Sequence, residues 1–354
     1  MNKSKTTVLL GAGAMIPFGG PTTEELTQRL LQNSECKGFF KPIFSRTNGK
    51  ANFEFLLSSF ESLLDWKLAN EDNDSQLINS SLLLETIYGY KYYPKRDIWE
   101  IYREAINEII ERIKDYDYFN SSYLDKLKFL VDFVSYKKQE SNLKIYSLNY
   151  DRLIPKIASK YGLDFYEGYG NKGYEYDLNK FNDCSITYYN LHGSIYIAYV
   201  TGGIKILDNP VTLEHMGYIH GGNPNKNTIF LPIIAGYSKS QRVMSEPFNF
   251  GIAAFMNDCN TCNRLVIVGY SFRDPHLNAI LRNFVKLNST DIVIVDYCKD
   301  NKMPNRLRGI PYQVFGIPGA KFIGERNSLY LDKDPHIHLY LDGFEQYIND
   351  NISL

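Results

Sequence analysis

"VLLGAGAMIPFGGPTTEEL", from Val8 to Leu26, carries the strongest fold signal in the sequence. Its apolar start, Val8 to Leu10, predicts a buried strand, and the glycines after it allow a tight turn and a close backbone approach. Thr22 and Glu25 have the spacing of a capping box, which predicts that a helix begins there. Backbone N–H groups near such a turn suit a phosphate group.

This stretch departs from the dinucleotide-binding fingerprint of ordinary NAD dehydrogenases. That fingerprint requires a third small residue where this chain has Ile16. It then requires a helix and a second strand with an acidic residue about 20 residues further along the chain. Pro17 and further glycines come instead. The alternative interpretation is an ordinary strand-to-helix turn, because a GxG motif by itself does not specify a ligand.

Composition favours a globular protein of one large core or two modest ones, since the chain has 354 residues, 22% charged and 44% hydrophobic. The formal net charge of −1, without a long basic run, predicts no direct binding of nucleic acid or of an anionic membrane. No stretch is long enough to span a membrane, and the broken apolar run near the amino terminus does not fit a signal peptide. Five cysteines, few and odd in number, indicate a reducing compartment, so we expect a soluble cytoplasmic protein.

Helical periodicity dominates from Thr22 to about Gln139. In "DIWEIYREAINEIIERIK" the apolar residues recur at steps of three and four, with Glu and Arg on the other face. "NFEFLLSSFESLLDW" and "YLDKLKFLVDFV" behave similarly. We therefore predict an inserted helical block, residues 22–139.

Short apolar or β-branched runs come after Asn142, each ending in small or polar residues, and they predict parallel strands buried on both faces. These runs are "LKIYSLNYD", "ITYYNLHGS", "NTIFLPII", "RLVIVGYSF", "DIVIVDYC" and the closing "HIHLYL". A helix, "DPHLNAILRNFVKL", lies between two of them, with Asp274 as the expected N-cap and Pro275 at its first position. The predicted fold is α/β, a doubly wound, mostly parallel Rossmann-like sheet in residues 1–21 and 140–354.

Ligands of such sheets bind outside the carboxyl ends of the strands, so the residues at those ends are the candidate site. One asparagine, one histidine and several glycines converge there. They are Gly11, Ala12 and Gly13 after the first strand, then Asn149 and Asp151, His192, Gly269 and Ser271, and Asp296 after the later strands.

The ordered set "GAGAMIPFG", "SLNYD", "NLHGS", "VGYSFRDPH" and "IVIVD" resembles the sirtuin-like family. Within that family it is most similar to the bacterial group of NAD-degrading effectors in anti-phage defence, rather than to the protein deacylases. The resemblance covers roughly residues 5–20 and 142–300. It implies an NAD glycohydrolase, which releases nicotinamide and ADP-ribose and uses NAD as its substrate.

The resemblance also implies roles around the nicotinamide. Asn149 would sit beside the nicotinamide ribose and help to place the attacking water, and Asp151 would hold the carboxamide. His192 would face the ribose hydroxyls and act as the general base.

Further roles implied by the resemblance lie along the rest of the dinucleotide. Gly11, Ala12 and Gly13 would line the pyrophosphate. Gly269 and Ser271 would contact the phosphate and adenosine side, and Asp296 the adenosine ribose.

These residue types suit the reaction. Nicotinamide in NAD is already a cationic leaving group, so the cleavage needs an oriented water and a stabilised oxocarbenium-like centre more than acid catalysis. An amide can orient water without protonating, and a histidine near neutral pKa can accept a proton. The paired carboxylates of ordinary sugar hydrolysis are therefore not required.

Two departures from the family's pattern bear on the activity. The deacylases carry a zinc ribbon of two CxxC pairs, whereas this chain has only Cys259 and Cys262 at that spacing, so we predict no zinc and two buried cysteines near a helix end. Met15 stands where related sequences commonly have a serine, and a thioether cannot donate to a phosphate.

Two other functions compete with NAD hydrolysis. A non-catalytic module that senses NAD or ADP-ribose would keep the glycines and Asp296 but tolerate the loss of Asn149. A protein deacylase is disfavoured by the missing ribbon. Because a constantly active NADase would poison its own cell, we expect gating by assembly as a homo-oligomer, by a bound signal or by a partner, and chains of this length resemble the partner of a ring-forming, helicase-like ATPase.

Overall fold

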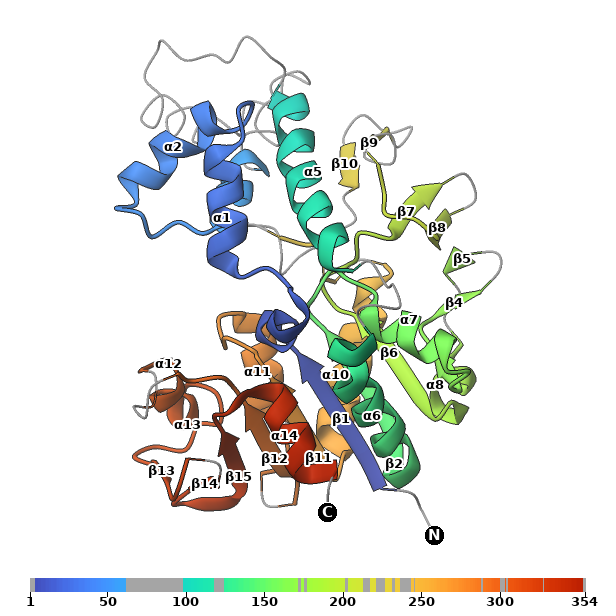
Figure 1. Ribbon diagram of the computed structural model, residues 1–354, viewed down its shortest axis with the longest axis vertical. Helices are drawn as coiled ribbons and strands as arrows, with labels where there is room; N and C mark the ends of the chain where they lie inside the picture. Colours follow the sequence, from blue (N-terminus) through green and yellow to red (C-terminus); the bar gives the residue numbers. More distant parts are fainter. Residues whose placement is uncertain are drawn as a thin grey trace. The chain divides into compact units, whose positions relative to one another are not determined.

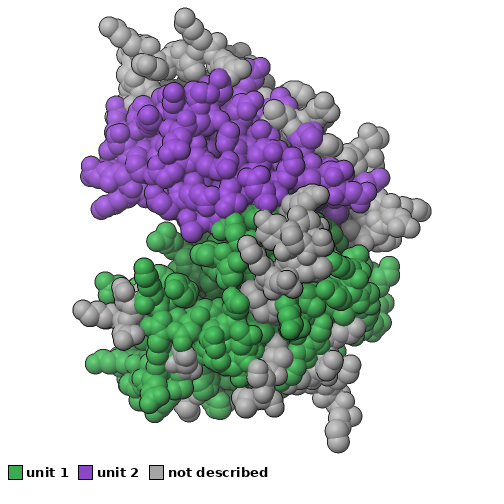
Figure 2. All heavy atoms as spheres, viewed as in Figure 1, with its two compact units in different colours: residues 1–20, 116–192, 244–354 green, residues 21–115, 193–243 purple. Residues whose placement is uncertain are grey.

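The computed structural model describes residues 4–61, 98–117, 124–170, 173–174, 177–200, 203–212, 217–220, 227–230, 233–235, 243–244, 246–287, 289–299, 303, 305–326 and 328–352 (Figure 1). The chain forms two compact units, which Figure 2 colours separately. Unit 1 comprises residues 1–20, 116–192 and 244–354, and unit 2 comprises residues 21–115 and 193–243.

Unit 1 is built on a nine-stranded sheet of order β13-β14-β15-β12-β11-β1-β2-β6-β3. Neighbours from β15 to β3 pair in parallel, and β13, β14 and β15 pair antiparallel at one edge. The strands are β1 (Ser4–Leu10), β2 (Ser141–Ser147), β3 (Phe165–Tyr166), β6 (Ile186–Asn190), β11 (Arg264–Val268), β12 (Asp291–Val295), β13 (Phe322–Ile323), β14 (Leu329–Leu331) and β15 (Asp334–Tyr340).

The strand order reverses at β1. The chain adds β2 and β6 on one side of β1, and then β11, β12 and β15 on the other side. This is the order of the doubly wound Rossmann sheet, whose ligand crevice lies at the carboxyl ends of the strands beside the reversal. The predicted fold class is therefore confirmed.

Helices cover both faces of this sheet (Figure 1). Helices α6 and α14 pack against each other on one face, where the rings of Phe133 and Phe344 lie 5.2 Å apart, and α10 and α11 pack together on the other. The helices and turns of unit 1 are η1 (Ala12–Ala14), η2 (Ile16–Phe18), α6 (Leu124–Glu140), α7 (Leu153–Lys160), α8 (Leu178–Asp183), α10 (Phe248–Thr261), α11 (Pro275–Phe284), α12 (Asn305–Arg308), α13 (Ile310–Gln313) and α14 (Gly343–Ile352).

The central strands are apolar throughout because both of their faces are covered. Val8, Leu9 and Leu10 of β1 have no exposed surface. Tyr146 of β2 stacks on Tyr189 with ring centroids 4.9 Å apart, and its hydroxyl donates to Asp258 Oδ2 at 2.5 Å. This buried framework fixes the strand ends from which the candidate site projects.

Unit 2 contains helices α1 (Thr23–Gln32), α2 (Lys37–Arg46), the helical residues 53–61 and α5 (Ile98–Tyr116) up to residue 115. Thr22 caps α1 as predicted, since its hydroxyl accepts the Glu25 N–H at 3.1 Å. The helices pack through aromatic rings, with Phe39 stacked on Phe60 at 3.9 Å. Two hairpins complete the unit, β7 (Ile197–Val200) with β8 (Gly203–Ile206) and β9 (Gly217–His220) with β10 (Asn227–Phe230), and the short pair β4 (Tyr169–Gly170) and β5 (Gly173–Tyr174) belongs to unit 1.

One sequence prediction about this architecture was wrong. "NTIFLPII" was expected as a strand of the parallel sheet, but β10 pairs antiparallel with β9 in a separate hairpin, because an apolar run does not specify its pairing partner. Asp274 is the N-cap residue of α11 and Pro275 is its first residue, as predicted, although the Asp274 side chain makes no capping hydrogen bond. Helix α6 packs on the sheet of unit 1, and residues 193–243 belong to unit 2.

The cysteines are free, and four are buried. Cys259 lies near the end of α10 and Cys262 caps it, which confirms the sequence prediction for this pair. Burial raises the pKa of the Cys262 thiol to about 11 and also raises that of Cys259.

Among the described residues, no helix has the length and apolar character needed to cross a membrane.

Alkylation of the native protein with iodoacetamide should modify Cys184 first. Cys184 is the cysteine that is partly exposed, whereas the buried, protonated thiols of Cys36, Cys259 and Cys262 should react much more slowly. Peptide mass spectrometry at pH 8 measures the order of labelling, and urea-unfolded protein, in which every cysteine should react, is the control. Rapid labelling of Cys259 and Cys262 would contradict their burial.

Candidate functional site

The predicted site residues lie at the carboxyl ends of β12, β11, β1, β2 and β6, which are consecutive in the sheet. Backbone hydrogen bonds continue past the strand ends and hold the rim together. Gly269 N donates to Val295 O at 2.8 Å, and Gly11 N donates to Val268 O at 2.8 Å. On the other side of β1, Leu148 N donates to Leu10 O at 2.9 Å.

The glycine turns after β1 and β11 are in backbone contact. Gly13 N donates to Gly269 O at 3.0 Å, and a Cβ on Gly11 would lie 2.5 Å from that same oxygen. Gly269 has a φ of +59°, and its Cβ would lie 2.3 Å from Ala14 N. Glycine is required at these positions so that the two turns can pack on each other.

Met15 is 2% exposed, which removes its side chain from the surface of the glycine turn. Its carbonyl accepts the N–H groups of Phe18 and Gly20 at 3.0 and 2.9 Å. The thioether therefore fills the core beneath the turn, whereas Ala12 is exposed. A phosphate at this turn would meet backbone groups and not the Met15 side chain.

Asn149 is 7% exposed and is held by the strand ends on both sides. Its side-chain Nδ2 donates to Gly11 O at 3.2 Å, and its backbone carbonyl oxygen accepts a hydrogen bond from Asn190 Nδ2 at 3.2 Å. In the part of the chain that the structure describes, no donor reaches Asn149 Oδ1. The amide is therefore fixed through its nitrogen while its oxygen can accept a hydrogen bond from a bound molecule.

His192 comes after β6 and is 2% exposed. Leu191 N donates to Ser147 O at 2.8 Å, which ties the His192 turn to the end of β2. The ring of His192 lies 5.8 Å from that of His276, centroid to centroid. His276 comes from the first turn of α11, after β11, so two imidazoles from separate strand ends meet at the rim.

Asp151 is buried at 1% exposure, and both of its oxygens accept hydrogen bonds from the protein. Tyr116 Oη donates to Oδ2 at 2.7 Å, and Leu153 N donates to Oδ1 at 3.0 Å. Burial raises the pKa of the Asp151 carboxyl, and the nearby Asp117 carboxylate raises it further. Both oxygens of the Asp151 carboxylate are thus used as hydrogen-bond acceptors within the protein.

Asp296 follows the last residue of β12, and its carboxylate forms an ion pair with Arg306. Arg306 Nη2 donates to Oδ2 at 2.8 Å, and Tyr297 N donates to Oδ1 at 2.8 Å. Arg306 is exposed, so a ribose hydroxyl could replace it at little electrostatic cost.

Ser271 is exposed on the loop between β11 and α11. The conformation of this loop is fixed from within, because Phe272 has a φ of +56° and its carbonyl accepts Asn278 Nδ2 at 2.8 Å. Tyr270 Oη in turn donates to Asn278 Oδ1 at 3.0 Å. These contacts hold Ser271 in position at the rim.

The structure brings two further residues to this rim, Tyr116 and Arg306, for which the sequence holds no functional signal. Tyr116 was part of a helical block, and nothing in its periodicity pointed to Asp151. Arg306 lies in a segment without a motif, and only a charge partner for Asp296 could have suggested it. His276 lies in the predicted helix "DPHLNAILRNFVKL", but its approach to His192 depends on the strand order of the sheet, in which β1 and β2 lie between β11 and β6.

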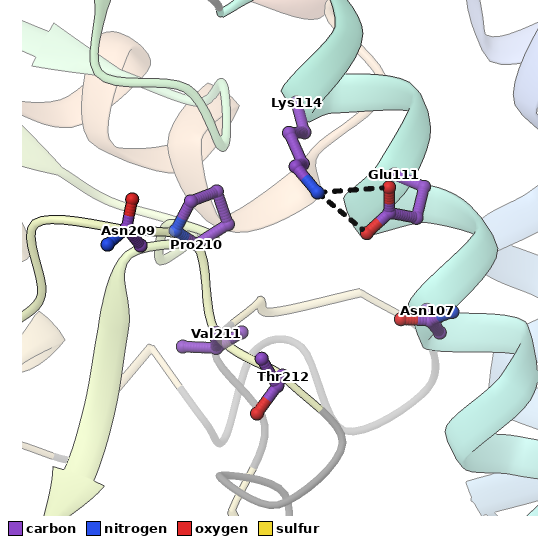
Figure 3. Close-up of a pocket in the computed structure, with 7 residues that line it drawn as sticks. All are labelled: Asn107, Glu111, Lys114, Asn209, Pro210, Val211 and Thr212. Atoms are coloured by element: carbon purple, nitrogen blue, oxygen red, sulfur yellow. Dashed lines mark hydrogen bonds and ion pairs between the residues drawn. The ribbon is translucent and has the colours of Figure 1, made fainter.

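A hollow of about 550 Å³ lies in unit 2 (Figure 3). It is lined by α5 and by a turn, through Asn107, Glu111, Lys114, Asn209, Pro210, Val211 and Thr212. Lys114 Nζ pairs with Glu111 at 3.3 Å, and both side chains are about half exposed. None of the predicted site residues lines this hollow.

Among the described residues, no cluster of histidine, cysteine and acidic side chains has a geometry that could hold a metal ion.

The sequence matches no protein-family model, and no curated protein matches it significantly. Among solved structures, the chain is similar to a mutant Sir2 homologue in complex with 2′-O-acetyl ADP ribose. The two share 12% sequence identity with a TM-score of 0.42, over 99% of this chain and 94% of that chain.

Replacement of Gly269 by alanine should destabilise the protein by more than about 3 kcal/mol, because the new Cβ meets the Ala14 backbone and the φ is left-handed. Urea unfolding monitored by circular dichroism measures the change. Gly38→Ala is the matched control, since a Cβ there meets nothing within 4 Å and alanine favours helix α2 by up to about 1 kcal/mol. Equal stability of Gly269→Ala and wild type would contradict the packing of the two turns.

Proposed function

We propose that this chain is an NAD glycohydrolase that cleaves the bond between nicotinamide and ribose. The observation that carries the proposal is the placement of Asn149 and His192 at the ends of the adjacent strands β2 and β6. Asn149 is anchored through Nδ2 to the glycine turn, and its side-chain Oδ1 accepts no hydrogen bond from the described residues. An oriented acceptor and a base beside a glycine turn form the set that this reaction needs.

The chemistry assigns a role to each group. Asn149 Oδ1 would accept a hydrogen bond from the water that attacks the anomeric carbon and hold it in line. His192 would accept a proton from the water or from a ribose hydroxyl. Nicotinamide leaves with the electron pair of the glycosidic bond as a neutral molecule, and ADP-ribose gains the hydroxyl.

The rim of unit 1 fits the rest of the dinucleotide. The exposed turn at Ala12 presents backbone to a pyrophosphate, and the exposed Ser271 can donate to the phosphate side. Asp296 would exchange Arg306 for hydroxyls of the adenosine ribose. These assignments accord with the resemblance stated for Gly11, Ala12, Gly13, Gly269, Ser271 and Asp296.

Wild-type protein incubated with NAD should release nicotinamide, and Asn149→Ala and His192→Ala should each lower kcat by about 100-fold or more. The reason is that Asn149 would orient the attacking water and His192 would accept its proton. Chromatography of nicotinamide and ADP-ribose over time measures the rate. Circular dichroism and urea unfolding establish that each variant is folded.

Matched controls come from the opposite end of the sheet. Asn142→Ala changes an asparagine near the start of β2, and His336→Ala changes an exposed histidine near the start of β15. Both should keep the wild-type rate. If Asn149→Ala and His192→Ala also kept it, these residues would not be the catalytic pair.

A module that binds NAD or ADP-ribose without cleaving it is the second candidate. It is favoured by one observation, the internal hydrogen bonds to both oxygens of Asp151, which leave that carboxylate less free for a substrate carboxamide. Calorimetric titration with ADP-ribose separates the two functions. Binding together with a complete absence of nicotinamide release, under every assembly condition, would support the sensing module.

We also propose that the hydrolase is a cytoplasmic, gated effector of anti-phage defence, in keeping with the group that the motifs resemble. Unregulated loss of NAD would kill the cell that makes the enzyme, so the activity should depend on assembly. A homo-oligomer, or a complex with a ring-forming, helicase-like ATPase, is the expected active form.

Specific activity should therefore rise with protein concentration as the chain assembles. Light scattering across the micromolar range gives the oligomeric state, and nicotinamide release at the same concentrations gives the activity. A protein that stays monomeric throughout and is fully active as a monomer would rule out gating by assembly.

A further inference from the structure

The last turn of α5 contacts the segment that carries Asn149. Tyr116, the final residue of α5, is 6% exposed, and its hydroxyl donates to Asp151 Oδ2 at 2.7 Å. The other oxygen of that carboxylate accepts the N–H of Leu153 at 3.0 Å. Tyr116 thus holds the carboxylate that in turn holds the first residue of α7.

Asp117 binds the same segment at further points. It has no exposed surface, and its Oδ1 accepts the backbone N–H of Arg152 at 3.2 Å. Lys156 Nζ donates to the Asp117 carbonyl at 2.6 Å and to Oδ2 at 3.0 Å. Burial of an unpaired carboxylate is costly, and the contact with Lys156 offsets that cost for Asp117. We call Tyr116 and Asp117 together the α5 clamp.

Two sets of contacts hold the segment around Asn149. One set binds Asn149 itself, and the α5 clamp binds the residues that follow it. Before Asn149, Ser147 Oγ accepts its backbone N–H at 3.1 Å, and Gly11 O accepts its Nδ2 at 3.2 Å. After it, the backbone at Asp151 and Arg152 is fixed by the clamp. The direction of the Asn149 amide depends on both, because a backbone rotation between them would swing Oδ1 away from the water it is to orient.

We propose that Tyr116 and Asp117 are positioning residues that set the orientation of Asn149, an inference that rests on the proposed hydrolase activity. Residues 98–115 of α5 belong to unit 2, whereas Tyr116 belongs to unit 1. The last residue of α5 thus belongs to the same unit as Asn149.

The variant Tyr116→Phe tests this proposal, since it keeps the buried ring and removes the hydroxyl that Asp151 accepts. We expect kcat for nicotinamide release to fall by about tenfold or more, with KM for NAD within about threefold of wild type, because misplacement of the water affects the chemical step. We also expect faster hydrogen exchange of the backbone amides in residues 149–153, measured by mass spectrometry.

Tyr102→Phe is a closely matched control. Tyr102 also lies on α5, is fully buried and donates to a carboxylate, Glu61 Oε1, at 2.6 Å, but it belongs to unit 2. It should cost the protein a comparable hydrogen bond while leaving kcat and the exchange of residues 149–153 at wild-type values. The contrast between the two variants separates positioning from a general loss of stability.

Each other outcome would overturn the proposal or a defined part of it. Unchanged exchange in Tyr116→Phe would show that the clamp does not hold the segment, and faster exchange with an unchanged kcat would show that Asn149 does not depend on it. Equal losses of kcat in both variants would assign the effect to stability. If the wild-type protein never cleaves NAD but Tyr116→Phe still shows faster exchange in residues 149–153, the proposed function is overturned and only the anchoring role of Tyr116 remains.

Discussion

The candidate site depends on the contact between two glycine turns. The turn after β1 and the turn after β11 approach so closely that Gly13 N reaches Gly269 O at 3.0 Å. Side chains on either turn would force them apart, since a Cβ on Gly269 would lie 2.3 Å from Ala14 N. The contact lies at the place where the strand order reverses, and from there the rim is built outward, to Asn149 and His192 on one side and to Asp296 on the other.

The rim is rigid because the sheet behind it is fully packed. The strands on either side of β1 are buried on both faces, and their backbone hydrogen bonds run on into the turns that carry the polar residues. Catalysis by positioning requires this kind of support, since a small displacement of the group that orients water costs much of the rate. In the proposed reaction, Asn149 would have that support from Gly11, Ser147 and the segment that the α5 clamp holds.

Charge at the rim is balanced within the protein. Asp117 pairs with Lys156 and Asp296 with Arg306, while the carboxylate of Asp151 accepts the Tyr116 hydroxyl. The exposed pair can exchange its partner for a ligand, whereas the buried groups cannot do so without losing hydrogen bonds. Asp296 is therefore the carboxylate that a ligand could reach, whereas Asp117 is held within the protein, although the two residues look alike in the sequence.

The sequence by itself determined the doubly wound sheet and the rim on which its polar residues gather. Short runs of apolar and β-branched residues in the sequence indicate buried strands. In a doubly wound sheet, the polar residues directly after each strand lie at the edge where ligands bind. The sequence could not determine that "NTIFLPII" leaves the sheet for a hairpin, since pairing depends on which partner strand is near. It also could not show Tyr116 beside Asp151, Arg306 beside Asp296 or His276 beside His192. Those contacts join residues from elements distant along the chain, and only the packing of the whole unit brings their side chains together.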